Sequence, residues 1–443
     1  MDYDVAVIGS GPAGAEVARL VALSGLETAL ITASPPGGRT TVGSLLPSKV
    51  WLHIAHHHHN QDRLNAKETQ RVAARVRSTI ERRSHQIADE LREAGVSIIR
   101  GTARLRSPGT LEVDGNDRPL RADRIVLAGG SEPLFAPGVR PTGSRILAPR
   151  HTKEITEIPE SMIMVGGGIT GVEYASAFAR LGSEVTLLAR RRILPSWDRE
   201  YVERWEDYLS SIGVDIHGSS EAVEARESES AVEVVTAGGE SFRADYAFIA
   251  TGRSADLASL SEDTRKLRDM GLETRDGFIV VDENGETSLE GVYACGDTTG
   301  APLVANKALL EARRVAYSIS GGTTGTKPQD TPLIEAVYTQ PQLAQIGSVP
   351  GDSTTTQVPG EELRIERRSY ERLTLSHIHT EVTPGEIKAW VTSSGKIAAA
   401  AAIGENAADV LAPVQLAMHH GIAWNELVRT PFAYPTLTEV ITT

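Results

Sequence analysis

Two glycine-rich turns have the residue spacing that binds nucleotide phosphates. They share glycines at the first, third and sixth positions, which are Gly9, Gly11 and Gly14 in one turn and Gly166, Gly168 and Gly171 in the other. Each turn follows an apolar run that predicts a strand and precedes a helical spacing of apolar residues. Such glycines let the backbone approach a pyrophosphate, whose charge the helix N-terminus stabilises. The chain therefore predicts two dinucleotide sites.

The end of the second strand in each unit indicates which nucleotide is bound. A carboxylate commonly binds the ribose hydroxyls there, but the chain has Thr32 in the first unit and Ala189 in the second, followed by Arg190, Arg191 and Arg192. Guanidinium groups in place of a carboxylate favour a ribose 2′-phosphate. We therefore expect the second site to prefer NADPH, with NADH as an alternative, and Arg190 as its first contact. A solvated basic turn is the competing interpretation, and Thr32 predicts an unphosphorylated ribose at the first site.

The chain has one cysteine, Cys295, which rules out an intrachain disulfide and clustered-thiolate metal sites. Cys295 lies in an apolar run, where we expect a small buried residue and no redox role. His53 and either His56 or His57 would share a helix face, but no carboxylate or cysteine stands at ligand spacing. We therefore predict no metal site.

Apolar periodicity predicts the elements that position these residues. Residues Tyr3–Leu30 and Met162–Leu188 each have the pattern of a strand, a glycine turn, a helix and a second strand. The other expected elements are a charged helix at about 61–94, short strands ending at 130, a helix at about 305–320, a linker at 321–328 and a separate α+β unit from 331 onward.

Length and charge limit the classes of partner. A chain of 443 residues, 40% of them hydrophobic, suffices for two to four domains. Lys and Arg number 45 against 58 Asp and Glu, with no basic block, so we expect no nucleic-acid partner. The longest apolar run, Ile397–Ile403, is far too short for a membrane span, and the N-terminus has no basic leader. We expect a soluble, cytoplasmic protein without a membrane partner.

Seven sequence motifs occur in the order typical of one protein family. They are Gly37-Gly38, Pro47-Ser48-Lys49, Ala128-Gly129-Gly130, the second glycine turn with Glu173, Ala250-Thr251-Gly252-Arg253, Tyr293-Ala294-Cys295-Gly296-Asp297 and Tyr434-Pro435-Thr436. Over nearly its whole length the chain resembles the pyridine nucleotide-disulfide oxidoreductases, which include glutathione reductase and dihydrolipoamide dehydrogenase.

The resemblance implies an α/β fold with two Rossmann-like dinucleotide-binding domains of the three-layer β/β/α type and a C-terminal α+β dimerisation domain. It implies an FAD-binding domain over residues 1–148 and 253–328, an NAD(P)H-binding domain over 149–252 and a dimerisation domain over 329–443. A homodimer is expected, with each copy completing the active site of the other.

The resemblance also implies roles for individual residues. Gly9, Gly11 and Gly14 would face the FAD pyrophosphate, Asp297 would bind the ribitol chain, and Gly130 and Arg253 lie in further cofactor-binding motifs. Lys49 and Glu173 would form an ion pair beside the flavin, where a cation stabilises the negative charge that arrives with the hydride.

The chain departs from the family where the redox disulfide belongs. The family has two cysteines between Gly-Gly and Pro-Ser-Lys, and Thr40 and Leu45 occupy their positions here. Near the C-terminus Tyr434 replaces the family's general-acid histidine, although the supporting Glu439 is present. A hydroxyl and a leucine cannot carry electrons from the flavin to a dithiol. The loss of the cysteine pair and the loss of the histidine are consistent with each other. Without a thiolate to protonate, the site needs no acid–base group of near-neutral pKa.

These features favour an NADPH-dependent flavoprotein that passes hydride to FAD and then directly to a small acceptor such as a quinone. Thr40, Leu45 and the second subunit's Tyr434 would line an apolar and aromatic acceptor pocket, with Tyr434 and Glu439 orienting the acceptor. The chain is also similar to the family's NAD(P)H quinone reductases, which lack the cysteine pair and have Tyr-Pro near the C-terminus.

Three other functions remain open from the sequence. The first is a soluble pyridine nucleotide transhydrogenase, a relative with the same Tyr-Pro-Thr ending, although the cluster after Ala189 disfavours the NAD binding that it needs. The second is a tailoring flavoenzyme with one dedicated substrate. The third is a non-enzymatic flavin or nucleotide sensor, which Lys49 and Glu173 disfavour.

Overall fold

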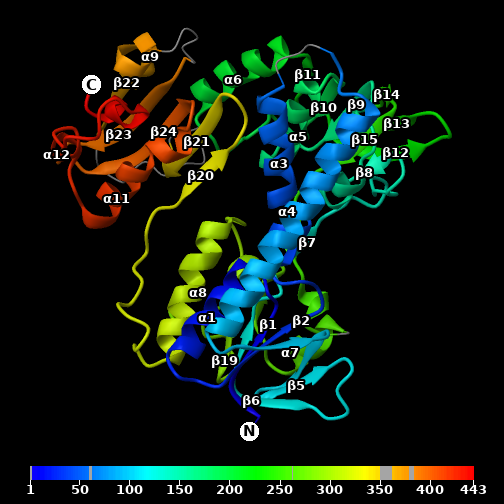
Figure 1. Cartoon of the computed structure of the whole chain (residues 1–443), viewed down its shortest axis with the longest axis vertical. Coiled ribbons are helices and arrows are strands. Elements are labelled where there is room, and N and C mark those ends of the chain that lie inside the picture. Colours follow the sequence, from blue (N-terminus) through cyan, green and yellow to red (C-terminus); the bar gives the residue numbers. More distant parts are fainter. Residues whose placement is uncertain (1, 59–61, 262, 350–361, 379–383) are drawn as a thin grey trace.

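The structure is a computed structural model that describes residues 2–58, 62–261, 263–349, 362–378 and 384–443. The chain forms three units, each built around its own main sheet (Figure 1). The first unit contains the N-terminus, the second contains the second glycine turn, and the C-terminal unit follows the crossing at residues 321–333.

The first unit is a three-layer structure around a parallel sheet. Its parallel strands are ordered β3-β2-β1-β6-β19, with bounds β1 (Tyr3–Ile8), β2 (Thr28–Thr32), β3 (Ser97–Arg100), β6 (Leu120–Leu127) and β19 (Val292–Ala294). Helices α1 (Pro12–Leu23) and α8 (Ala305–Ile319) pack together against one face. The antiparallel strands β4 (Ala103–Ser107) and β5 (Thr110–Val113) continue from β6 and share the core of the other face. The expected three-layer fold is confirmed.

The second unit repeats this plan. Its parallel sheet has the order β11-β10-β9-β15-β8, with bounds β8 (Ile146–Leu147), β9 (Ser161–Val165), β10 (Glu184–Leu188), β11 (Val214–His217) and β15 (Tyr246–Ile249). Helices α5 (Ile169–Arg180) and α6 (Arg199–Ser211) pack on one face. The antiparallel strands β12 (Ala222–Glu227), β13 (Val232–Thr236) and β14 (Ser241–Ala244) cover the other.

Three helices lie between β2 and β3 in the chain: α2 (Gly38–Val42), α3 (Leu45–His56) and α4 (Ala66–Glu93). Helix α3 packs against α5 of the second unit. The sequence pattern predicts the start of α4 at about residue 61, which lies outside the described residues, whereas the helix begins at Ala66. Asn65 sets this start, because its side chain accepts a hydrogen bond from the backbone N–H of Glu68 and the Glu68 carboxylate accepts one from the N–H of Asn65.

The C-terminal unit is α+β, as expected. Its antiparallel sheet has the order β20-β21-β24-β23-β22, with bounds β20 (Ile334–Val337), β21 (Gln342–Gly347), β22 (Leu363–Ser369), β23 (Glu386–Thr392) and β24 (Ile397–Gly404). Its helices are α9 (Thr374–Ile378), α10 (Ala407–Val410), α11 (Ala412–His420), α12 (Trp424–Leu427) and the 3₁₀ segment η5 (Leu437–Ile441).

Shorter elements complete the structure. They are β7 (Ser131–Pro133), β16 (Arg253–Ala255), β17 (Thr274–Arg275), β18 (Phe278–Ile279), α7 (Thr264–Asp269), η1 (Pro149–Glu154), η2 (Leu257–Ser259), η3 (Gly296–Thr299) and η4 (Tyr370–Arg372). In the described part of the chain, every helix falls short of the length or the apolar character needed to cross a membrane.

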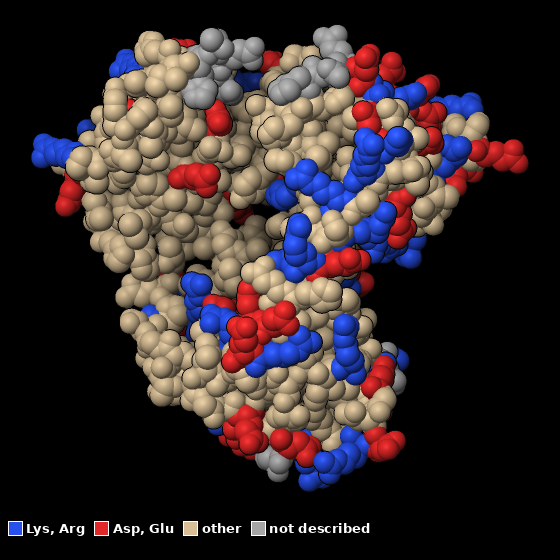
Figure 2. Space-filling view, viewed as in Figure 1, with Lys and Arg blue, Asp and Glu red and all other residues tan. Residues whose placement is uncertain are grey.

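Charged residues are unevenly distributed over the face of the molecule that Figure 2 shows. Figure 2 shows residues of both signs intermixed over the first and second units, whereas the C-terminal unit presents mainly uncharged residues on this face. Large apolar side chains are exposed on the C-terminal unit, including Ile378, Leu416 and Tyr434.

Candidate active site

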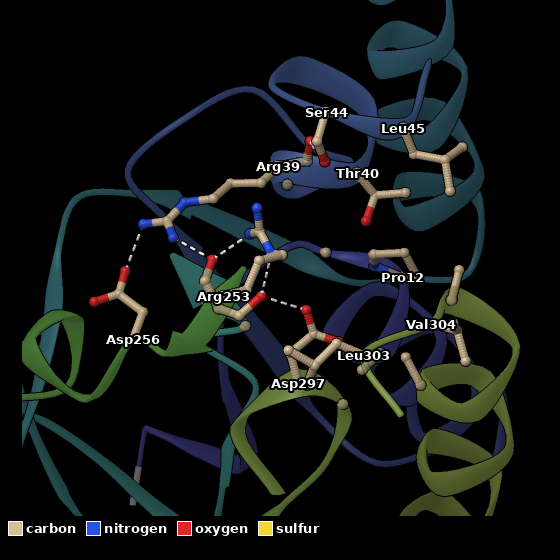
Figure 3. Close-up of a pocket in the computed structure, with 18 of the residues that line it drawn as sticks. Pro12, Arg39, Thr40, Ser44, Leu45, Arg253, Asp256, Asp297, Leu303 and Val304 are labelled. Carbon is tan, nitrogen blue, oxygen red and sulfur yellow. Dashed lines mark hydrogen bonds and ion pairs between the residues drawn. The ribbon is translucent and has the colours of Figure 1, made fainter. Parts of the chain in front are cut away.

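A cavity of about 820 Å³ opens where the three units meet. Its wall includes residues expected to bind FAD or the acceptor, which are Gly9, Gly11, Thr32, Thr40, Leu45, Lys49, Gly130, Glu173, Arg253 and Asp297. Gly168 also lines it, and β20 and its C-terminal flank supply Ile334 and Tyr338. Figure 3 shows Thr40 and Leu45 at one end of the cavity and Arg253 and Asp297 further along it. Residues far apart in the sequence therefore converge on one site.

The two glycine turns have the same packing, which explains their shared spacing. A Cβ on Gly9 would lie 2.2 Å from the carbonyl oxygen of Ala128, and one on Gly166 would lie 2.2 Å from that of Ala250. At the sixth position, a Cβ on Gly14 would lie 1.9 Å from the Gly9 oxygen. A Cβ on its counterpart Gly171 would lie 1.8 Å from the carbonyl oxygen of Gly166. These glycines allow strand and helix to pack closely.

The middle glycines face open space. A Cβ on Gly11 or Gly168 would have no heavy atom within 4 Å, and both residues line the cavity at the N-termini of α1 and α5. A glycine here leaves room for a phosphate at the positive end of a helix. The residues present therefore fit the dinucleotide groups that the sequence predicts.

Thr32 and the arginine cluster lie at the strand ends, as expected. The Thr32 hydroxyl is buried, donates to the backbone oxygen of Ser34 and lies 2.7 Å from the Ser10 hydroxyl. In the second unit a Cβ on Gly167 would lie 2.8 Å from the Cβ of Ala189, so the residues after Ala189 begin beside the second glycine turn. Arg190 and Arg191 are exposed there, outside the wall of the 820 Å³ cavity.

Lys49 and Glu173 form the predicted ion pair. The Lys49 Nζ lies 2.8 and 2.7 Å from the two carboxylate oxygens of Glu173. Glu173 is 2% exposed and also accepts from the Ser48 hydroxyl, at 3.3 Å. Helix α3 carries Lys49 and helix α5 carries Glu173, so the packing of these two helices sets the geometry.

Tyr338 completes this cluster and was not predicted from the sequence. Its backbone N–H donates to a Glu173 oxygen at 3.0 Å, and the Lys49 Nζ lies 4.7 Å from the centre of its ring. Burial and the Glu173 charge raise the pKa of the Tyr338 phenol. Lys49 is thus held between a carboxylate and an aromatic face.

The positions of the family's disulfide lie in the cavity wall. Thr40 is on α2, Leu45 begins α3 and is 41% exposed, and both line the cavity. The one cysteine, Cys295, is fully buried, as expected, and burial together with the Glu311 charge raises the pKa of its thiol well above the usual range. A raised thiol pKa opposes thiolate formation, so Cys295 is unsuited to replace the missing pair.

Tyr434 and Glu439 lie away from the cavity of their own chain. Tyr434 is 70% exposed, and its hydroxyl contacts that of Thr374. The buried Glu439 accepts a hydrogen bond from the backbone N–H of Thr436 at 2.8 Å and so caps η5. Glu439 therefore orders the segment that follows Tyr434.

The histidines in α3 and just after it, His53, His56 and His57, lie outside this cavity. The rings of His53 and His57 are 4.4 Å apart, and burial together with the His57 charge lowers the pKa of His53. Across the described ranges, no group of three or more His, Cys, Asp or Glu side chains has a metal-binding arrangement. His59 lies outside the described residues.

Comparison with known proteins identifies matches over almost the whole chain. Residues 3–312 match the pyridine nucleotide-disulphide oxidoreductases, and residues 334–443 match their dimerisation domain. The dihydrolipoyl dehydrogenase of Chlorobaculum tepidum is 30% identical over 457 residues, which cover 99% of this chain and 95% of that protein. The NAD(P)H dehydrogenase (quinone) of Mycobacterium tuberculosis is 26% identical over 468 residues, which cover 99% of this chain and 92% of that protein.

Two solved structures share the fold. The crystal structure of LpdA from Mycobacterium tuberculosis superposes with a TM-score of 0.89 at 24% identity, covering 99% of this chain and 98% of that one. The HOCl-induced flavoprotein disulfide reductase RclA from Escherichia coli superposes with a TM-score of 0.87 at 23% identity, with the same coverage. The chain belongs to the pyridine nucleotide-disulphide oxidoreductases, a family of flavoproteins that bind FAD and NAD(P)H.

Proposed function

We propose that the chain is an NADPH-dependent flavoprotein oxidoreductase that delivers electrons from FAD directly to a flat small acceptor such as a quinone. The observation that carries this proposal is the pair Thr40 and Leu45 in the cavity wall, where the family's two cysteines belong. A redox disulfide within the chain needs two cysteines, and the chain has only Cys295, which is buried.

Different residues of the cavity would bind different parts of FAD. Gly9 and Gly11 would hold the diphosphate at the α1 N-terminus, Thr32 the adenosine ribose, and Asp297 the ribitol chain. When bound, FAD would supply the redox chemistry, which is acceptance of a hydride from NADPH and release of two electrons to the acceptor. The chain's own residues then determine the charge around that reaction and the space that an acceptor can enter.

Lys49 would supply positive charge where negative charge develops. Its ammonium is fixed by both oxygens of Glu173 and by the Tyr338 ring, so no reorganisation is needed when charge arrives. Glu173 is buried and receives four hydrogen bonds from Lys49, Ser48 and the Tyr338 backbone, which keep the carboxylate in place.

The exposed guanidinium groups after β10 support a preference for NADPH. Arg190 and Arg191 follow the strand whose last residue, Leu188, pairs with Val165 just before the second glycine turn. A nucleotide held at that turn would place its ribose near these residues, and a guanidinium group binds a phosphate with two parallel hydrogen bonds.

The acceptor would enter beside Thr40 and Leu45. Leu45 offers an exposed apolar surface within the cavity wall, which suits a flat apolar ring. In a homodimer formed through the dimerisation domain, the exposed Tyr434 of one copy would close the pocket of the other, and Glu439 would hold its segment. The quinone-reducing relative from Mycobacterium tuberculosis supports this acceptor class.

A screen of acceptors with NADPH tests the proposed function. We expect rapid reduction of menadione and ferricyanide, and little reduction of lipoamide or glutathione disulfide. Rapid reduction of thio-NAD⁺ with no reaction of quinones would instead identify a transhydrogenase. An oxidised flavin spectrum that NADPH leaves unchanged under anaerobic conditions would identify a binding protein without this activity.

A further inference from the structure

Arg39 lines the cavity of about 820 Å³, and both ends of its side chain are held in place. It belongs neither to a glycine turn nor to the family motifs described above. It follows Gly38, which packs directly against the first glycine turn, because a Cβ on Gly38 would lie 2.7 Å from the Cα of Gly11. The backbone N–H of Gly37 also donates to the Ser10 oxygen at 2.8 Å. Arg39 therefore leaves the backbone beside the residues that would hold a diphosphate.

The far end of the Arg39 side chain is anchored beside Gly130, which also lines the cavity. Its Nη2 lies 2.6 Å from Oδ2 of Asp256, and its Nη1 donates to the backbone oxygen of Ser131. Asp256 is itself fixed, because its other carboxylate oxygen accepts from the Ser259 N–H and its own N–H donates to the Gly130 oxygen. These contacts occupy two of the five guanidinium N–H groups of Arg39 and leave donors for another oxygen ligand.

A second guanidinium group converges on the same atom. Arg253 donates to the Ser131 oxygen at 2.6 Å and to the Ser131 hydroxyl at 2.8 Å, and that hydroxyl also donates to Asp297. Figure 3 shows the two guanidinium groups near each other, that of Arg39 on the side of Asp256 and that of Arg253 on the side of Asp297. Burial and the Arg39 charge both lower the pKa of Arg253, while Asp297 opposes this shift. Two guanidinium groups therefore share one carbonyl oxygen, and each keeps N–H groups that can donate to a further oxygen ligand.

The charges in this cluster balance only if Arg39 is present. Within this cluster the positive charges of Arg39 and Arg253 offset the negative charges of Asp256 and Asp297. Removing Arg39 would leave the cluster with one net negative charge, which would oppose binding of a diphosphate. The ribose end offers no compensation, because Thr32 contributes a neutral hydroxyl. We propose that Arg39 binds the diphosphate of FAD and supplies affinity that a carboxylate at position 32 would otherwise supply at the ribose. The inference rests on FAD binding and is independent of the acceptor.

Dissociation of FAD from the holoenzyme tests this role. FAD-loaded protein is diluted, and the flavin fluorescence gives the dissociation constant at several salt concentrations. We expect Arg39→Ala to weaken FAD binding by about tenfold or more, because a charged hydrogen bond is lost. Its affinity should also depend less on salt than that of the wild type. Arg63→Ala is the matched control, since Arg63 is similarly exposed and pairs with Glu160 outside the cavity wall.

A double variant separates binding from simple neutralisation of Asp256. If Arg39 acts on the diphosphate, Arg39→Ala combined with Asp256→Asn still binds FAD about tenfold more weakly than the wild type. If the double variant recovers wild-type affinity, Arg39 only offsets Asp256 and the proposal is wrong. Arg39→Gln keeps a polar chain of similar length and should show the same loss, which covers the case in which the alanine variant is unstable.

Phosphorus NMR of the holoenzyme reports on the diphosphate itself. The two phosphorus signals of bound FAD should shift between the wild type and Arg39→Gln and stay in place in Arg63→Ala. Unshifted signals in Arg39→Gln, or an unchanged FAD dissociation constant, would overturn the proposal. Because these measurements need no turnover, failure of the proposed acceptor chemistry would leave their outcome unaffected.

Discussion

At the scale of single residues, the site contains a lysine–glutamate ion pair, and a threonine and a leucine occupy the positions where the resemblance predicts two cysteines. Lys49 and Glu173 have a geometry suited to an anionic reduced cofactor, while Thr40 and Leu45 have no redox chemistry. The sequence could predict that these residues lie in one site, because each lies in or beside a recognisable motif. It could not predict this for Tyr338 and Asp256, since they reach the site only through contacts between distant segments.

Lys49→Met tests the charge-stabilising group. Reduction of the flavin by NADPH should slow roughly 10²-fold, the loss typical of removing one preorganised electrostatic contact. The FAD content should change little. Anaerobic stopped-flow absorbance measures the rate, with Lys67→Met on the exposed face of α4 as the control. An undiminished rate would remove Lys49 from the mechanism.

Arg190→Ala tests the nucleotide preference. The KM for NADPH should rise about tenfold while that for NADH stays nearly constant, because only NADPH carries the 2′-phosphate. Steady-state kinetics with both nucleotides give the ratio, and Arg243→Ala, an exposed arginine of β14 in the same unit, is the control. Equal changes in the KM values for NADPH and NADH would show that the ribose 2′-phosphate does not bind at Arg190.

At the scale of elements, the two strand–turn–helix units follow from local patterns. Apolar strands and glycine spacing predict β1–α1–β2 and β9–α5–β10, because close packing at Gly14 and Gly171 tolerates no side chain. The start of α4 was misplaced because charged residues continue past its N-terminus and blur the periodicity. The capping box of Asn65 and Glu68 is the signal that locates it.

A pair of glycine variants separates the structural and binding roles of the first turn. Gly14→Ala forces a Cβ against the Gly9 oxygen and should lower the free energy of unfolding by about 3 kcal/mol. Gly11→Ala meets open space and should cost less than about 1 kcal/mol, yet its methyl group enters the cavity and should reduce the bound FAD. Thermal unfolding and the flavin-to-protein ratio measure both effects. Equal stability and equal FAD content in the two variants would refute this division.

At the scale of the whole molecule, a charged cluster joins the second and C-terminal units. Lys388 is 2% exposed on β23, and its Nζ lies 2.8 Å from Asp198 and 2.8 Å from Glu200 at the start of α6. Arg367 of β22 pairs with Glu200 at 2.6 Å and with Glu386 at 2.8 Å. The sequence could not predict this cluster, because its members are far apart in the chain and none lies in a motif.

The acid dependence of stability follows from Glu200. Its hydrogen bond from Arg367, reinforced by Lys388, lowers the pKa of the carboxyl from 4.5 to about 2. Because the folded-state pKa is lower, the stabilisation is full above about pH 4.5 and is lost as the pH falls toward 2. Glu200→Gln should lower the free energy of unfolding by roughly 0.5–1 kcal/mol at neutral pH, since the Glu200–Arg367 pair is partly exposed. At pH about 2 the loss should be much smaller. Urea unfolding at both pH values measures this, and an equal cost at the two would contradict it.

The most direct test of the whole account is the fate of electrons loaded anaerobically from NADPH. The flavin should take up two electrons per FAD and stop there, since the chain has no second redox group. The reduced protein should then regain its oxidised spectrum on mixing with menadione and stay bleached with lipoamide or glutathione disulfide. Uptake of four electrons per FAD, or reoxidation by a disulfide and not by the quinone, would contradict direct transfer from the flavin.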